Sequence, residues 1–386
     1  MVGSLGLFVS YYARGYRLNL QTFKFQPNGI LVLKSEPDGA SVYIDGDLKT
    51  ATNANISLSP GTYDVEVRKE GFFSWYKRLV IEKEIVTQVF ISLFKNVPSL
   101  SPVTSTGVVN PVMAEDGSKI VYSILPSNDV ESDKTGLWDL DTFSLPLGFG
   151  AGPKRITDGD MMGASYIFSP GGKQVLLTIS NSSFLIDTGS FTSQNQRINI
   201  ASRKDTTLAS WTAEKELKDQ NLIRNLPPEL SDILSRKSSS FIFSPDDNMI
   251  LYTASSSGTL PEGLVRPLPG ASTQRQERNI GTGRTYIYDI KEDRNFLITD
   301  QPVTINNIDN PQTGALRWMS TSRHLLLAQS GQIVIMDYDG TNRQVVYSGS
   351  YITPSAFPFS NTTKLLILTN LGAPSASVNL YTLTVK

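Results

Sequence analysis

The sequence predicts an all-β protein in which a small β-sandwich is followed by a β-propeller. Short alternating apolar runs, separated by Gly, Pro and Asp turns, fill residues 29–94. An eleven-residue pattern then recurs five times within residues 95–386. Charged residues make up 18% of the chain, below the usual share of about 25%. Ser, Thr, Asn, Gly and Pro fill the difference, as is typical of strands and turns.

The composition excludes several kinds of chemistry. The 386 residues include one histidine and no cysteine. The chain therefore has no disulfide framework, thiolate metal site or cysteine nucleophile, and it cannot build a site from several imidazoles. We predict no catalytic residues, no metal site and no cofactor. The net charge of −1 gives no basic field, so we also expect no nucleic-acid partner.

Residues 1–28 are a hydrophobic segment and a linker. Residues 2–13 are mostly apolar or small, they end in Tyr11 and Tyr12, and Arg14 follows. The run is shorter than the roughly 20 residues that a spanning helix needs. It could be an N-terminal strand or arm that packs on the body, or the outer half of a signal-anchor helix that starts upstream of Met1. We favour the remnant of a membrane anchor, because aromatic side chains are typical of the membrane–water interface.

Residues 29–94 carry the alternation of a small β-sandwich. Period-two spacing places one side of each run on a core and the other in solvent. Turn sequences such as Pro37-Asp38-Gly39 and Asp45-Gly46 separate the runs. The expected strands lie at 30–34, 41–45, 56–58, 63–67, 79–81 and 86–93.

This module resembles the PEGA domain family. The segments SEPDGASVYIDG (35–46) and LSPGTYDVEVRKEGFFSW (58–75) carry the resemblance, with Asp38 where the family's name-giving turn has Glu. The resemblance implies a non-catalytic surface or envelope module, which often stands beside a membrane anchor. It transfers no catalytic residue.

The segment RKEGFFSWYKR (68–78) mixes basic and aromatic residues. Such a mixture can contact single strands or a membrane surface, but it also fits a hairpin with aromatics on the core and charges in water. We favour the hairpin and keep contact with the envelope or with the second domain as the functional alternative. The candidate interaction residues here are Phe72, Phe73, Trp75 and Tyr76.

The repeated pattern starts with a large apolar residue, continues through a polar turn and ends in an apolar strand. The five copies start at Met113, Phe168, Phe243, Trp318 and Phe359. We expect the apolar runs to be buried inner strands and each copy to be followed by another strand, as in GLWDLD (136–141) and QIVIMD (332–337). Small antiparallel sheets that cannot cover both faces alone are typical of propeller blades. The count predicts five blades, or six if one is too divergent to see.

FSPGGKQVLL (168–177), FSPDDNMILY (243–252) and DYDGTNRQ (337–344) resemble the WD40-like repeats of TolB-type propellers. The resemblance implies a binding platform with partners on a rim or in the central funnel. The last copy ends close to residue 386, so we expect its outer strand to come from residues 96–110 and to close the ring non-covalently.

Two blades carry long insertions. Residues 204–237 show an intermittent apolar stripe interrupted at Pro227-Pro228, which predicts two helices that cap one end of the ring. Residues 255–284 are rich in Ser, Gly, Pro and Arg and read as a solvated loop. Insertions on a rigid scaffold are common recognition sites. The candidate interaction residues here are Arg266, Arg275 and Arg278.

Catalysis finds little support in the sequence. His324 lies within an apolar repeat strand, where a structural role is expected, and no G-x-S-x-G nucleophile elbow occurs. Asp337, Asp339 and Gly340 resemble part of a calcium loop, but their spacing stops short of the twelve-residue pattern. Carboxylate chemistry in the funnel remains the enzymatic alternative.

We therefore predict that the chain is not an enzyme but a monomeric, membrane-tethered cell-envelope protein that binds a protein or cell-wall glycan. The alternative is a propeller hydrolase that uses funnel carboxylates, and two or three converging acids would favour it. A cytoplasmic scaffold is a third possibility.

Overall fold

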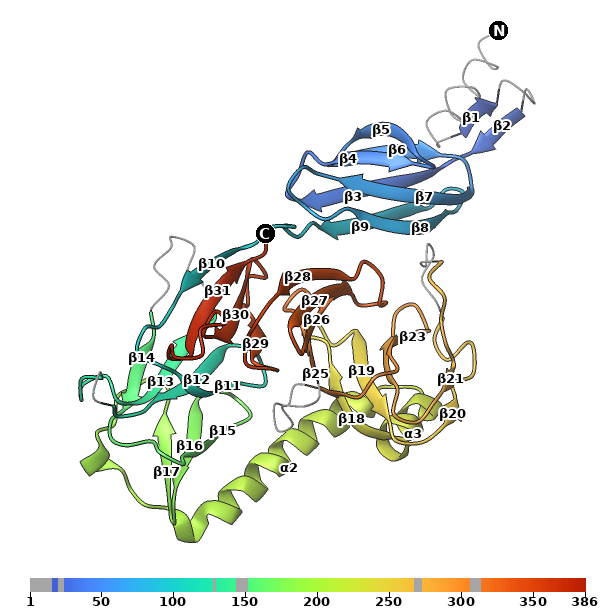
Figure 1. The fold of residues 1–386 in the computed structure, drawn as a ribbon. Coiled ribbons are helices and arrows are strands. Elements are labelled where there is room, and N and C mark those ends of the chain that lie inside the picture. Colours follow the sequence, from blue (N-terminus) through green and yellow to red (C-terminus); the bar gives the residue numbers. More distant parts are fainter. Residues whose placement is uncertain (1–15, 20–23, 128–129, 144–151, 267–272, 306–313) are drawn as a thin grey trace.

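The computed structural model describes residues 16–19, 24–127, 130–143, 152–266, 273–305 and 314–386. The chain is mostly β, as predicted, with a small sandwich above a ring of radial sheets (Figure 1). Most of the predicted N-terminal segment lies outside the described residues, so its membrane role stays a prediction. Its described part is the hairpin of β1 (Tyr16–Asn19) and β2 (Lys24–Pro27). None of the described helices combines the length and apolar character needed to cross a bilayer.

The module is a sandwich of two sheets with strand orders β6-β3-β9 and β5-β4-β7-β8. Alternation places Leu31 and Leu33 from one sheet against Val65 and Val67 from the other, and all four are fully buried. Burying a side chain of this size stabilises the fold by about 1.5–3 kcal/mol relative to exposure. The strands are β3 (Gly29–Glu36), β4 (Ser41–Ile44), β5 (Asp47–Ala51), β6 (Ala54–Leu58), β7 (Gly61–Arg68), β8 (Trp75–Ile81) and β9 (Val86–Ser92).

Apart from one short two-stranded sheet, the described residues after the module form five sheets of three to five strands, whose first strands face the middle of the ring (Figure 1). Each apolar repeat strand lies inside its sheet, so it is flanked by a strand on both sides. The first sheet contains β11 (Val109–Met113), β12 (Lys119–Ile124), β13 (Gly136–Asp141) and β14 (Lys154–Thr157), and the second contains β15 (Ser165–Phe168), β16 (Gln174–Ile179) and β17 (Ser182–Asp187). The third contains β18 (Ser238–Phe243), β19 (Met249–Ala254), β22 (Thr285–Asp289) and β23 (Arg294–Thr299). The fourth contains β24 (Val303–Ile305), β25 (Gly314–Trp318), β26 (His324–Gln329), β27 (Gln332–Asp337) and β28 (Gln344–Ser348).

The fifth sheet closes the ring. It joins β29 (Ala356–Pro358), β30 (Lys364–Thr369) and β31 (Asn379–Thr384) to β10 (Ser99–Pro102), which comes from the start of the propeller region. Leu100 pairs with Leu383 in this antiparallel register. The expected non-covalent closure by residues 96–110 is therefore confirmed. The number of blades stays a prediction.

The five repeat copies share one turn. In each, a backbone N–H donates to the carbonyl three residues earlier, at 2.9–3.0 Å, and the donor has a positive φ. Asn, Asp and Gly are the residues that adopt this conformation at least cost, yet Ser322 and Thr362 adopt it here. The turn shows that the fifth copy starts at Pro358, one residue before the Phe359 start predicted from sequence. The donors are Gly117, Gly172, Asp247, Ser322 and Thr362.

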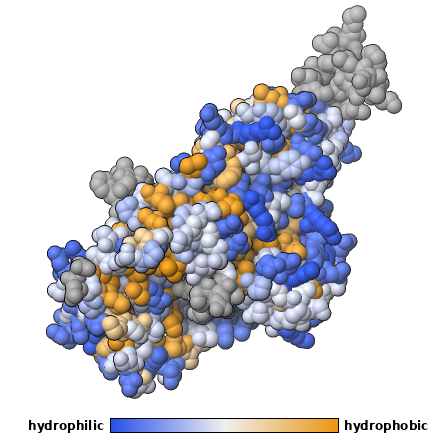
Figure 2. Space-filling model, viewed as in Figure 1, coloured by the Kyte–Doolittle hydropathy of each residue, from blue (hydrophilic) through white to orange (hydrophobic). Residues whose placement is uncertain are grey.

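Adjacent sheets pack face to face and share apolar layers. In β26, for example, Leu325 and Leu327 face the β18–β23 sheet, while Leu326 and Ala328 face β29–β31. The sheet of β15–β17 is different, because only its Val175 face joins such a layer among the described residues. On its other face Ile167 is 51% exposed and Leu185 37% exposed. Figure 2 shows apolar surface over this part of the ring.

The insertion at 204–237 forms two helices, α2 (Lys204–Ile223) and α3 (Pro228–Arg236), with the break at the predicted prolines. The expected packed cap is wrong for α2, which buries no side chain and crosses from β17 towards β18 at the lower edge of Figure 1. Its apolar residues are too widely spaced to form a continuous stripe. In α3, by contrast, Leu230, Ile233 and Leu234 are buried against the β18–β23 sheet.

Candidate functional site

The structure brings the two insertions together. Helix α3 comes from the first, and the short strand β20 (Gly258–Thr259) with the following Pro261 comes from the second. They form the walls of an open groove of about 570 Å³. Two insertions held by one rigid sheet are a typical position for recognition. The groove is lined by Pro228, Glu229, Asp232, Ile233, Lys237, Thr259 and Pro261.

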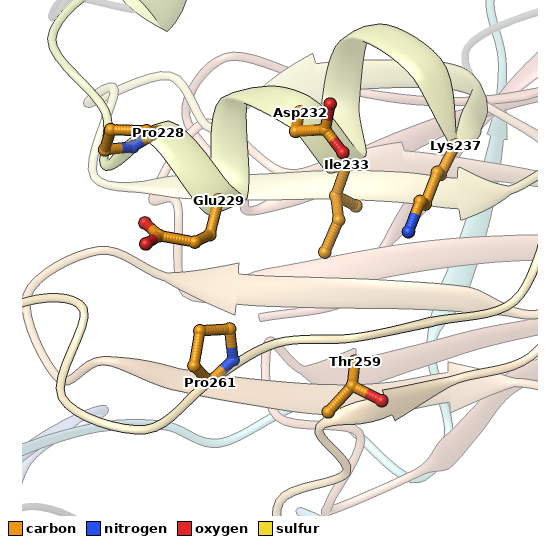
Figure 3. Close-up of a pocket in the computed structure, with 7 residues that line it drawn as sticks. All are labelled: Pro228, Glu229, Asp232, Ile233, Lys237, Thr259 and Pro261. Atoms are coloured by element: carbon orange, nitrogen blue, oxygen red, sulfur yellow. The ribbon is translucent and has the colours of Figure 1, made fainter.

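One face of α3 supplies the main wall of the groove. Glu229, Ile233 and Lys237 are spaced four residues apart, so they lie along the same side of the helix. Figure 3 shows Ile233 and Lys237 pointing from α3 towards the segment with Thr259 and Pro261, whereas Glu229 extends sideways along the same side of the helix. Asp232 points away and pairs with Arg236 at 3.0 Å. Within the described residues neither the Glu229 carboxylate nor the Lys237 ammonium makes an ion pair or hydrogen bond.

Arg278 supports the opposite wall from behind. Its Nη2 lies 3.1 Å from Oδ2 of buried Asp293, and its Nη1 donates a hydrogen bond to the carbonyl of Pro261. The Leu260 N–H donates to the Arg278 carbonyl at 2.9 Å. Arg278 was predicted as an interaction residue, and the structure places it as a support behind the groove. Its guanidinium is only 12% exposed, which leaves little of it for a partner.

Arg266 and Arg275 are exposed and do not line the groove. The segment that contains Arg275 reaches the module instead, because the Thr273 hydroxyl donates to the Arg78 carbonyl at 2.6 Å. Their roles in binding stay predictions. Strands β20 and β21 (Asn279–Ile280) pair within this insertion, so the described part of it is more ordered than the expected solvated loop.

A second polar cluster joins the module to the propeller. The Lys77 ammonium, on β8, lies 2.7 Å from Oδ2 of Asp339 and 3.5 Å from Oδ2 of Asp337, and its side chain is 10% exposed. The indole N–H of Trp75 donates to Asp337 at 3.1 Å. Asn342 accepts the Tyr76 backbone N–H at 2.9 Å. We call Trp75, Lys77, Asp337, Asp339 and Asn342 the junction.

The aromatic candidates of segment 68–78 divide between the two domains. Phe72 packs on the module core, whereas Phe73 packs on the layer between β26 and β30 in the propeller. Trp75 is buried at the junction, and Tyr76 is half exposed. Of the alternatives for this segment, the structure shows contact with the second domain.

The four basic residues of the same segment are all engaged within the protein. Arg68 pairs with Glu66 at 2.6 Å, and Arg78 pairs with Asp64 at 2.6 Å. Lys69 donates to the Asp38 carbonyl at 2.7 Å, and Lys77 lies in the junction. The hairpin interpretation therefore accounts for these charges.

Charges in the junction shift the pKa values of its members. Burial raises the pKa of Asp337, and the neighbouring Asp339 adds to the shift. Burial alone would lower the pKa of Lys77, but the charges of Asp339 and Asp337 raise it. The aspartate charges therefore favour a charged lysine, whereas burial favours the protonated form of Asp337. The Lys77 ammonium lies against the carboxylates of Asp337 and Asp339, in the turn where the sequence suggested a weak resemblance to a calcium loop.

His324 lies beside the junction, with Nε2 3.6 Å from Oδ1 of Asp337. Its ring packs edge-on against Phe94 at 5.2 Å. Burial, helped by the charges of Lys386, Arg323 and Lys77, lowers the pKa of His324 to about 3. The imidazole is therefore neutral near pH 7 and buried away from the groove, as the expected structural role requires.

The first strands of the five sheets carry no Asp or Glu. They present Phe, Tyr, Ile, Val, Ala and Ser, with Arg317 of β25 buried against the carbonyls of Pro354 and Ala356. Across the described ranges, no group of three or more His, Asp or Glu side chains is placed to hold a metal ion. The converging carboxylates that would favour a funnel hydrolase are not found on these strands.

Comparison with known proteins identifies the module. Residues 28–96 match the family model of the PEGA domain. The resemblance predicted from residues 35–75 is thus confirmed. No curated protein matches the chain.

Several solved propeller-type structures are similar to the chain at low identity. TolB from Acinetobacter baumannii is 13% identical with a TM-score of 0.23, and the match covers 83% of this chain and 59% of that one. The putative TolB from Agrobacterium tumefaciens is 12% identical with a TM-score of 0.21, covering 70% of this chain and 76% of that one. The gluconolactonase XC5397 from Xanthomonas campestris is 9% identical with a TM-score of 0.30, covering 75% of this chain and 90% of that one. The chain thus spans less than two thirds of the first TolB structure.

Proposed function

Because residues 28–96 form a PEGA domain, we propose that the chain is a non-catalytic cell-envelope protein that binds a protein or glycan partner through its propeller. Domains of this family are typical of extracellular and periplasmic proteins. A hydrophobic segment at residues 2–13 precedes the module and supports a membrane tether. In this arrangement the module is the spacer between the tether and the ring.

One observation carries the binding role. The two long insertions meet in a groove that presents an unpaired carboxylate, Glu229, and an unpaired ammonium, Lys237. Both charges have favourable positions at the ends of α3, and without side-chain partners they are available to a ligand of complementary charge. The support from Arg278 and Asp293 fixes one wall before any ligand arrives.

The hydrolase alternative has less support, because the first strands bring no carboxylates towards the middle of the ring. Hydrolysis of cell-wall glycan or of a peptide library by the purified chain would favour the hydrolase alternative. A change of the visible acids at hairpin turns should then abolish the turnover.

Crosslinking on intact cells with a membrane-impermeant reagent tests the proposal. We expect recovery of extracytoplasmic partners and a chain that remains with the membrane fraction. Recovery of cytoplasmic partners alone would contradict the envelope role.

A further inference from the structure

We infer that the groove between α3 and Thr259–Pro261 binds an extended peptide with a basic residue, an apolar residue and an acidic residue at alternate positions. The inference rests on the proposed binding function and names the partner class for the same site. Its basis is the order of charges along α3: a carboxylate at Glu229, an apolar side chain at Ile233 and an ammonium at Lys237.

The spacing along the helix sets the spacing in the peptide. Eight residues separate Glu229 from Lys237, which at about 1.5 Å per residue corresponds to about 12 Å along α3. An extended chain rises about 3.3 Å per residue, so four residues span about 13 Å. A peptide whose charged residues lie at positions i and i+4 therefore matches the backbone separation of Glu229 and Lys237 along α3.

Strand periodicity gives the middle residue. In an extended peptide, residues i, i+2 and i+4 point to the same side. The residue at i+2 then faces the apolar part of the groove, formed by the exposed Pro228 and Pro261, to which the largely buried Ile233 adds only a small area. The expected motif is Arg/Lys-x-apolar-x-Asp/Glu, with the basic residue on Glu229 and the acidic residue on Lys237. This order of charges also fixes the direction of the peptide, whose N-terminal part lies at Glu229.

Charge complementarity favours a peptide over a neutral sugar. A glycan without charges would leave Glu229 and Lys237 unpaired, and the groove has no aromatic side chain on which a sugar ring could stack. Each exposed ion pair contributes modestly, so we expect removal of one to weaken binding about two- to fivefold.

The test uses the full chain and fluorescent seven-residue peptides. The matched peptide is Gly-Arg-Ser-Val-Ser-Glu-Gly, and the controls place Arg at both charged positions or Glu at both. We expect the matched peptide to bind best to the unchanged protein. Glu229→Lys should shift the preference to the peptide with two Glu, and Lys237→Glu should shift it to the peptide with two Arg. Glu214→Lys, on the exposed surface of α2, is the control and should change nothing.

Each variant is compared across the three peptides, so a general loss of stability cannot imitate a change of preference. Equal binding of all peptides, an unchanged preference in Glu229→Lys, or no saturable binding up to about 1 mM would overturn the inference. If the peptides fail while intact cells still yield extracytoplasmic partners, the proposed function stands and this inference falls. If both fail, the binding role itself is wrong.

Discussion

The Lys77 ammonium of the module lies 2.7 Å from the Asp339 carboxylate of the propeller, and the Asp339 side chain is fully buried. An ion pair in this setting has given up most of its water, so it holds only if both charges remain. The pair therefore ties the two domains in one orientation. That orientation places the module beside β27 and β28, with the C-terminus next to it (Figure 1).

The first prediction concerns this pair. Lys77→Met should lower the free energy of unfolding by about 3–5 kcal/mol, because it leaves Asp339 and Asp337 buried without their cation. Chemical denaturation measures the change. Lys49→Met removes the exposed pair with Asp47 and should cost less than about 1 kcal/mol. A similar small cost for both variants would show that the junction does not hold the domains.

The second prediction concerns pH. The folded state keeps His324 neutral down to about pH 3, whereas the unfolded chain protonates near 6.5, so stability should fall as pH decreases between these values. His324→Gln should flatten this fall, by up to about 1.4 kcal/mol per pH unit. Urea denaturation at a series of pH values checks the slope.

Asp337 acts in the opposite direction and needs its own control. Its raised pKa means that the folded state holds the proton to a higher pH, so this group costs stability as pH rises above about 3.8. Asp337→Asn should therefore make the loss of stability on acidification steeper. A pH profile that is unchanged in both variants would contradict this account of the junction.

The third prediction concerns the arginines of the second insertion. Arg278→Ala should destabilise the chain by about 3 kcal/mol or more, since the buried Asp293 then loses its cation and keeps only its hydrogen bonds from Tyr288 and Gly263. Arg266→Ala and Arg275→Ala should change stability by less than about 0.5 kcal/mol, because both side chains are exposed. Thermal unfolding of the three variants separates the supporting arginine from the two that are free to contact a partner. Equal stability of all three variants would show that Arg278 does not support the groove wall.

The fourth prediction concerns ring closure. Leu383 lies on β31 and is buried at the closing sheet, so Leu383→Ala should cost about 2–5 kcal/mol. Leu371→Ala is the control, because that side chain is 53% exposed and should be nearly neutral. Denaturation with urea compares them. If Leu383→Ala were also neutral, closure through β10 and β31 would not hold the ring.

Much of the fold could be predicted because the relevant signals are local. Alternation located six of the seven module strands but missed β5, and the repeated turn located the apolar repeat strand of each sheet. The start of the fifth copy was displaced by one residue because Phe359 looks like the opening residue, whereas the turn hydrogen bond shows that Phe359 follows it. Only backbone geometry distinguishes these two alignments.

The site was harder to predict because it depends on contacts between distant segments. Both insertions were recognised from sequence, but their meeting at the groove was not. The spacing of Glu229, Ile233 and Lys237 was visible as one face of a helix, yet nothing local indicated that Pro261 faces it. Arg278 was selected for its charge, which Asp293 in fact neutralises. The partners of Trp75 and Lys77 lie about 260 residues away in sequence.

The most direct test of the account places a photo-crosslinking residue at Thr259, in the groove wall, in intact cells. A matched residue at Thr212, on exposed α2, is the control. We predict capture of an extracytoplasmic protein from Thr259 but not from Thr212, with loss of the crosslink in Glu229→Lys. Equal capture from both positions, or capture from Thr259 that Glu229→Lys leaves unchanged, would contradict a binding role for this groove.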